Sequence, residues 1–249
     1  AAAIQGQLNF SRDMEREADR VGFGVLTGAG YSAAGMAAMF EQLAHASGLN
    51  DAGAYPYLRT HPLTSERIGE ARSRLGTTPP GSATGSLLEH AAMRGRARVL
   101  MDSRDDALRR WQGQDADRQN ATEPERFASL YASALASSRL RQWARSDAAI
   151  ERLEGMAADA PSARRSVELL KAETLIARGD PAGAQRVLAQ LPPDVGGVPS
   201  RTWLFAMAQA RLAAARPDAA ALTLTADDLQ TWVATHKRDA YAWSLLARA

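Results

Sequence analysis

The stretch Ala149-Ile-Glu-Arg-Leu-Glu-Gly-Met156 is followed 35 positions later by Ala184-Gln-Arg-Val-Leu-Ala-Gln-Leu191. In both stretches alanine and leucine recur at the four-residue spacing of one helix face, and a proline follows within a few residues. Similar helices at a fixed offset are the mark of a structural repeat. The pattern therefore predicts pairs of helices that stack on one another, with small residues where two helices approach closely.

The same offset of 35 positions applies one helix earlier in each unit. It relates Ser137 to Ala172 and Leu140 to Leu175. A period near 34 residues is typical of tetratricopeptide repeats. Residues from about 125 to 249 resemble a degenerate array of such repeats, and the resemblance implies a concave surface that binds a protein partner or substrate.

Other segments extend the array on both sides. Residues 87–113 supply one or two helices that we expect to cap it, and residues 201–215 resemble another first helix. The tract 217–228 is irregular, and Tyr241-Ala-Trp-Ser-Leu-Leu-Ala247 resembles the opening of one more repeat.

The first part of the chain is organised differently. Helices are predicted over 11–27, with Ser11 as the N-cap, over 32–46, and from Thr64 or Ser65 to residue 75. A glycine- and proline-rich stretch then breaks every periodic pattern. The predicted domains are residues 1–76 and 87–249, joined by a linker over 77–86.

The first two predicted helices carry apolar residues at three- and four-residue spacing, and we expect these faces to need a partner surface. The residues concerned are Met14, Ala18, Val21 and Val25 in the first helix, and Met36, Met39, Phe40 and Leu43, which are predicted to face inward, in the second.

The composition excludes several classes of function. The chain has 249 residues, 30 basic and 28 acidic side chains, and no cysteine. It has no basic run of the kind that binds nucleic acid, no thiolate metal site or disulfide, and no apolar run of the roughly 20 residues that cross a membrane. Alanine, leucine and arginine dominate, so an all-α protein is predicted.

Two short segments carry the candidate chemistry. The first is Glu15-Arg-Glu-Ala-Asp-Arg-Val-Gly22, and the second is Thr60-His-Pro-Leu-Thr-Ser-Glu-Arg67. Glu15 and Asp19 lie four positions apart and share a helix face. Acidic pairs on helices usually face water. On spacing alone, the pattern therefore favours a solvated acidic pair flanked by arginines over a metal site.

Together the two segments resemble the M48 family of zinc metallopeptidases over about the first 75 residues. In that family an E-x-x-A-D-x-x-G helix supplies the third zinc ligand, and an H-P-L-x-x-R segment follows. The resemblance implies that Glu15 binds zinc and that Asp19 orients a zinc-bound histidine. It implies functional roles for His61 and Arg67 near the open metal position or the developing oxyanion, but which residue plays which role stays open.

The two histidines and the glutamate of the HExxH helix, which the family places upstream, do not occur in this chain. We therefore expect a C-terminal fragment that holds zinc weakly and hydrolyses nothing alone, since a catalytic zinc needs three protein ligands. The resemblance is to periplasmic bacterial members that act in quality control of outer-membrane proteins, and it implies a metalloendopeptidase with zinc as cofactor. The alternative is a non-catalytic repeat scaffold that binds proteins.

Overall fold

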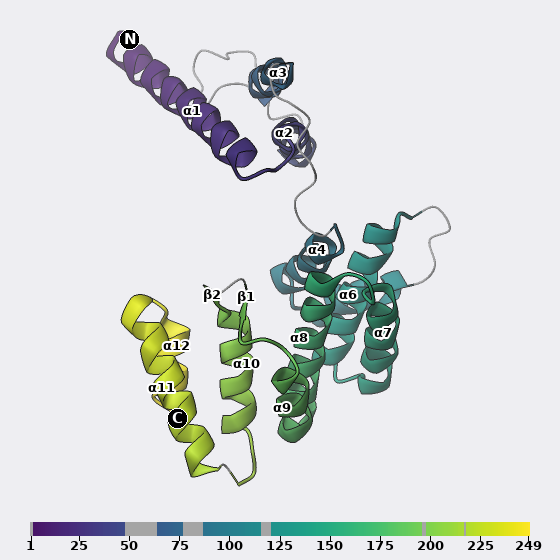
Figure 1. Cartoon of the computed structure of the whole chain (residues 1–249). Helices are drawn as coiled ribbons and strands as arrows, with labels where there is room; N and C mark the ends of the chain where they lie inside the picture. Colours follow the sequence, from purple (N-terminus) through teal and green to yellow (C-terminus); the bar gives the residue numbers. More distant parts are fainter. Residues whose placement is uncertain (1, 48–63, 77–86, 116–120, 196–197, 217) are drawn as a thin grey trace. The chain divides into compact units, whose positions relative to one another are not determined.

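The computed structural model describes residues 2–47, 64–76, 87–115, 121–195, 198–216 and 218–249. These residues form α-helices, together with one short antiparallel pair of strands, β1 (Asp194–Val195) and β2 (Val198–Pro199). The predicted all-α class is confirmed. The chain divides into two compact units, residues 1–85 and 86–249, which Figure 1 shows in purple to blue and in teal to yellow.

The first unit contains three helices, α1 (Ala2–Gly28), α2 (Ala34–Ser47) and α3 (Thr64–Leu75). The helix α1 begins nine residues before the predicted N-cap Ser11, because the preceding residues are mostly alanine, glutamine and leucine, which favour helix. It ends at Gly28, and Gly30 takes up the left-handed conformation with φ of 82° that other residues adopt at a cost. The predicted third helix is confirmed.

The core of the first unit lies between α2 and α3. Phe40 is 1% exposed and packs with Ala37 and Ala71, while Met36 and Ile68 lie at the edge of this cluster. The prediction that Met39 and Leu43 face inward is wrong, since about half of each side chain is exposed. A narrow face of α2, centred on Ala37 and Phe40, is sufficient for contact with α3.

One face of α1 is apolar and exposed. Phe10, Met14, Val21 and Val25 have exposed fractions of 67%, 56%, 49% and 67%. They recur at spacings of four, seven and four residues, which places them along one stripe of the helix. We call these four residues the α1 stripe.

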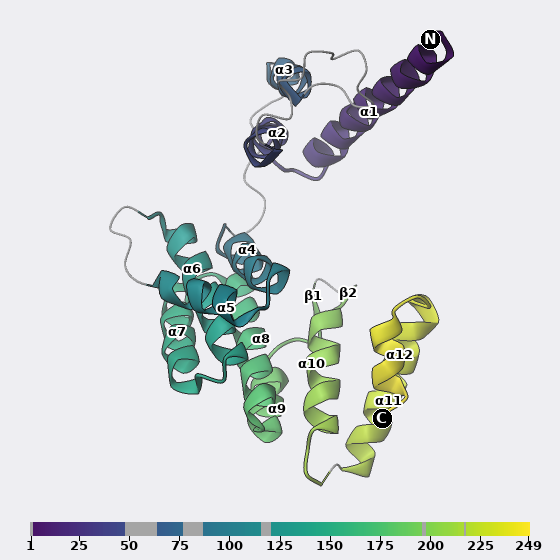
Figure 2. The same ribbon diagram turned by 180° about the vertical axis from the view of Figure 1, so that it is seen from behind.

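The second unit contains the remaining helices, which follow one another through short connections (Figure 2). They are α4 (Leu87–Met101), α5 (Asp105–Gln112), the 3₁₀ turn η3 (Gly113–Asp115), α6 (Glu123–Arg139), α7 (Trp143–Met156), α8 (Pro161–Arg178), α9 (Pro181–Ala189), α10 (Arg201–Leu212), α11 (Ala219–Thr235) and α12 (Ala240–Leu246). Successive helices pack on each other, α6 on α7, α8 on α9 and α10 on α11.

The positions related by the 35-residue offset are core positions. Ala149 and Ala184 are 3% and 0% exposed, and Leu153 and Leu188 are both fully buried. Ser137 and Ala172, one helix earlier in each pair, are also buried. The offset therefore marks equivalent packing positions in two helical pairs, while the assignment to the tetratricopeptide class stays a prediction.

Helix ends in this unit follow local sequence signals. Thr122 and Glu125 form a reciprocal capping box at the start of α6, and the Asp180 side chain accepts a hydrogen bond from the backbone N–H of Gly183 at the start of α9. Asp218 accepts from the backbone N–H of Ala220 at the start of α11. Residues 219–228 are therefore helical, and the prediction of an irregular tract over 217–228 is wrong for them.

Two helices of the second unit approach closely at Gly95, in the contact of α4 with α6. A Cβ added at Gly95 would lie 2.5 Å from the carbonyl oxygen of Ala128 and 3.2 Å from Cβ of Tyr131. Both atoms belong to the main core of the unit, which also contains Phe127 and Leu135. Glycine is required here because only hydrogen fits between the helices.

None of the helices in the described ranges is long and apolar enough to cross a membrane.

Candidate functional site

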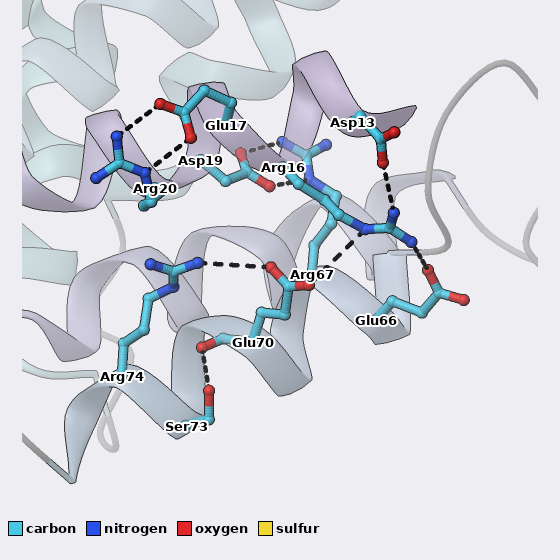
Figure 3. Close-up of polar contacts among 10 residues, drawn as sticks. All are labelled: Asp13, Arg16, Glu17, Asp19, Arg20, Glu66, Arg67, Glu70, Ser73 and Arg74. Carbon is cyan, nitrogen blue, oxygen red and sulfur yellow. Dashed lines mark hydrogen bonds and ion pairs between the residues drawn. The ribbon is translucent and has the colours of Figure 1, made fainter. Parts of the chain in front are cut away.

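The two motif segments meet between α1 and α3. Arg67 of α3 reaches across to Asp19 of α1, as Figure 3 shows. Its Nε donates to Oδ2 of Asp19 at 2.8 Å and its Nη2 donates to Oδ1 at 2.7 Å. A guanidinium that binds both oxygens of a carboxylate fixes the relative orientation of the two groups, and this pair joins residues 48 positions apart.

Glu15 belongs to the same cluster. Its Oε2 lies 3.4 Å from Nη1 of Arg67, so the guanidinium contacts both acidic side chains of the first motif. The exposed fractions of the side chains are 28% for Glu15, 15% for Asp19 and 25% for Arg67. The hydrogen bonds that Arg67 donates to Asp19 raise the pKa of the guanidinium above its ordinary value. Partial burial lowers this pKa, and the negative charges of Asp19 and Glu15 raise it.

The ring of Phe40 supports the guanidinium from the side of α2. The Cζ atom of Arg67 lies 4.3 Å from the ring centroid, within the range of a cation–π contact. Phe40 is also buried in the core between α2 and α3, so it ties the charged cluster to that core. Sequence analysis placed Phe40 only in a core face, and nothing in its spacing indicates the contact with Arg67.

Further ion pairs surround the cluster at the surface (Figure 3). Arg16 of α1 lies 3.7 Å from Glu66 and 3.8 Å from Glu70 of α3, and Arg20 donates two hydrogen bonds to Glu17 within α1. These side chains are 42–57% exposed, so water screens each pair and its contribution to stability is small. They reinforce the pairing of α1 with α3 but do not define a site.

The donor set of the described residues does not by itself form a zinc site. A catalytic zinc takes three protein ligands and keeps one open position. Within the described ranges no three His, Cys, Asp or Glu side chains are grouped so that they hold a metal ion. Glu15 and Asp19 do not make a zinc site on their own, and His61 lies outside the described residues.

The structure brings together three of the four predicted site residues, Glu15, Asp19 and Arg67. It gives no position for His61. The chemical roles that the resemblance implies for these residues stay predictions. The geometry adds one fact about Arg67, namely that three of its nitrogens face the two acidic side chains of α1.

Comparison with known proteins shows that the segment carrying this cluster is similar to a family of peptidases. Residues 1–75 match the sequence model of Peptidase family M48, and this range includes both motif segments. A stretch of 122 residues is also 38% identical to a protein of Vibrio cholerae serotype O1 (strain ATCC 39315 / El Tor Inaba N16961) named putative beta-barrel assembly-enhancing protease. That alignment covers 47% of this chain and 22% of the relative, so the chain spans about a fifth of the relative's length.

Proposed function

We propose that residues 1–76 are the C-terminal part of an M48-type zinc metalloendopeptidase domain, and that residues 87–249 bind the protein on which the enzyme acts. The observation that carries the proposal is the cluster of Arg67 with Asp19 and Glu15. It unites the two family motifs in three dimensions, through a bidentate pair that is largely shielded from water.

In this proposal Glu15 is the third protein ligand of the metal, and zinc when bound supplies Lewis acid chemistry and a water of lowered pKa. Asp19 orients a histidine ligand by accepting the N–H of its ring. Both oxygens of Asp19 already accept from Arg67, and each keeps a further lone pair for such a contact.

Arg67 is better placed as a positioning residue than as a group that stabilises an oxyanion. Its Nε and Nη2 are used on Asp19, and its Nη1 faces Glu15. A guanidinium held in this way neutralises part of the acidic charge and keeps both carboxylates in fixed orientations on α1. The metal ligands then meet the ion without first being reorganised.

In this proposal the α1 stripe is the surface on which the HExxH helix of the peptidase domain packs. On a helix with 100° per residue, Met14 and Val21 lie about 100° and 120° from Glu15, on the side of α1 away from Phe23. Phe23 is 8% exposed, whereas Met14 and Val21 are about half exposed. A helix that covers the α1 stripe would therefore lie beside Glu15. A segment that supplies the other two zinc ligands has to lie in such a position.

The name of the Vibrio relative supports a role in the assembly of β-barrel proteins, and we extend this role to the present chain. Substrates of this kind are misfolded or misassembled outer-membrane proteins, which implies a periplasmic location in a Gram-negative bacterium. The second unit would recruit the substrate or a protein complex through its helical pairs.

The proposal is tested by expressing the complete reading frame that contains this sequence. Zinc content and cleavage of an unfolded protein such as casein are measured for the wild type and for Glu15→Gln. The substitution should remove most of the zinc. It should reduce cleavage at least about a hundredfold, because even residues that only support the metal ligands cost about 10- to 100-fold when they are replaced. Wild-type cleavage that persists after chelation, or a Glu15→Gln protein with full zinc content, would contradict the proposal.

A second candidate function is a non-catalytic scaffold. The observation that favours it is that the second unit has a core of its own and a groove lined by several of its helices. Binding of a protein partner that is unchanged by zinc and by Glu15→Gln, without any cleavage, would support the scaffold over the peptidase.

A further inference from the structure

Phe40 of α2 belongs both to the core of the first unit and to the charged cluster. Its ring is 1% exposed and packs with Ala37 and Ala71. Ala71 follows Arg67 by one turn of α3, so the two residues lie on the same side of that helix. The core therefore holds the ring beside the helix face from which the Arg67 side chain starts.

The guanidinium of Arg67 meets its partners through different surfaces. Its N–H groups lie in the plane of the group, and Nε and Nη2 donate to Asp19 at 2.8 Å and 2.7 Å (Figure 3). These bonds use the edge of the guanidinium and leave its faces for an aromatic ring. Its Cζ atom lies 4.3 Å from the centroid of the Phe40 ring, whose face carries negative charge density. The ring and the carboxylate therefore hold the cation without competing for it.

Partial burial favours both contacts. The side chain of Arg67 is 25% exposed and that of Asp19 is 15% exposed. A cation–π contact becomes stronger as water is excluded from it. Arginine also has a long side chain with many rotamers, so a guanidinium without support has several orientations open to it. A buried ring on one side restricts this choice.

The orientation of the guanidinium matters for α1. In the described part of the first unit, the buried apolar cluster around Phe40 consists of residues of α2 and α3. Asp19 and Glu15 of α1 contact Arg67. Arg16 of α1 also lies near two glutamates of α3, but these pairs are exposed and water screens them. The shielded contact at Arg67 therefore sets where the two carboxylates of α1 stand.

We propose that Phe40 is a positioning residue of the site. Its ring holds the guanidinium of Arg67, and the guanidinium holds Asp19 and Glu15 in the orientation in which they serve the metal. Because Phe40 is buried, it acts only through Arg67. The inference rests on the proposed function for the role of the two carboxylates, but not for the contact of the ring with the guanidinium.

The test changes the charge of the ring face and keeps the shape of the side chain. In the full chain, Phe40 is replaced by phenylalanine that carries one, two or three ring fluorines, which withdraw electron density from the face. Fluorine also makes the ring more apolar, so a ring that only fills the core should lose no stability. We expect hydrogen exchange in α1 to accelerate in steps with the number of fluorines. The trifluorinated ring should give about three- to tenfold faster exchange, the change that matches the loss of a cation–π contact.

Two controls separate this effect from a change in packing. In the Arg67→Gln background the same fluorine series should leave exchange in α1 unchanged, because the cation is gone. The series is also introduced at Phe23 of α1, which is 8% exposed and has no cation over its ring among the described residues. It should have no graded effect. Exchange in α1 that does not respond to fluorines at Phe40, or that responds equally in the Arg67→Gln background, would overturn the proposal.

The complete reading frame provides the functional part of the test. Its zinc affinity, measured by competition with a chelator, should fall in the same order as the number of fluorines at Phe40 rises. A zinc affinity that stays constant while exchange in α1 accelerates would overturn the role of Phe40 at the metal. A reading frame that binds no zinc contradicts the proposed function. The exchange series involves no metal, so it still supports or overturns the positioning of Arg67 and the carboxylates by the ring.

Discussion

Replacing Arg67 by glutamine should loosen the first unit by an amount that follows from its contacts. The guanidinium makes two short hydrogen bonds to Asp19, and the side chains are 25% and 15% exposed. A hydrogen bond to a charged group contributes about 1.5–3 kcal/mol, whereas an exposed ion pair contributes about 0–1 kcal/mol. For this mostly shielded pair, with Phe40 beneath the guanidinium, we expect a loss of about 2 kcal/mol.

The assay is hydrogen exchange of the full chain, followed for peptides from α1 and α3 by mass spectrometry. A loss of about 2 kcal/mol corresponds to exchange about thirtyfold faster in segments that open together. Exchange in the second unit, for example in α6, should not change.

Arg72→Gln is the control for this experiment. Arg72 also joins α3 to α2, through a 2.6 Å contact with Glu41, but the two side chains are 63% and 40% exposed. Its removal should cost less than about 1 kcal/mol. A double-mutant cycle of Arg67→Gln with Asp19→Asn isolates the pair. Exchange in α1 that is unchanged by Arg67→Gln, or equally fast in Arg72→Gln, would refute the reasoning.

Three further predictions concern other parts of the chain. Gly95→Ala should lower the stability of the second unit by about 1–3 kcal/mol in urea unfolding because its Cβ meets the Ala128 carbonyl, whereas Gly155→Ala, with open space around its Cβ, should be neutral or slightly stabilising. Hydrogen bonds from Arg201, Trp232 and the Ala242 backbone hold the pKa of Asp239 below its ordinary value, so this carboxylate stabilises the fold above about pH 4 and the contribution is lost as the pH falls below that. Asp239→Asn should remove this acid-dependent component, and identical pH profiles of stability for the variant and the wild type would contradict the assignment. The chain alone should retain no stoichiometric zinc after dialysis, and elemental analysis that finds one zinc per chain would overturn this.

Some structural features follow from local sequence and others do not. The helix over residues 64–75 is predictable because its signals are local. Glu66 is an acidic residue in the first turn, and Arg72 and Arg74 are basic residues in the last turn. Sequence spacing does not predict the contact of Arg67 with Asp19, because the two residues lie 48 positions apart. The residues 48–63, which precede Thr64, also carry no periodic signal. Only the family resemblance indicated that the two segments belong to one site.

The errors have a common physical origin. Apolar spacing identifies which residues share a helix face but not whether a partner covers that face. Met39 and Leu43 follow the spacing of Phe40, yet α3 covers only the part of α2 around Phe40. Likewise, the composition of the tract 219–228 does not show that tertiary packing holds it. The tract is the start of α11, which Asp218 caps and whose Leu229 and Val233 are buried.

The zinc stoichiometry and peptidase activity of the complete reading frame, compared with Glu15→Gln in the same frame, decide whether Glu15 is a metal ligand of a peptidase. We predict an HExxH segment upstream of Glu15 and about one zinc per chain in the wild type. We also predict chelator-sensitive cleavage of an unfolded protein, and loss of both zinc and cleavage in Glu15→Gln. A reading frame without an HExxH segment, or a Glu15→Gln protein that keeps its zinc and its activity, would contradict it.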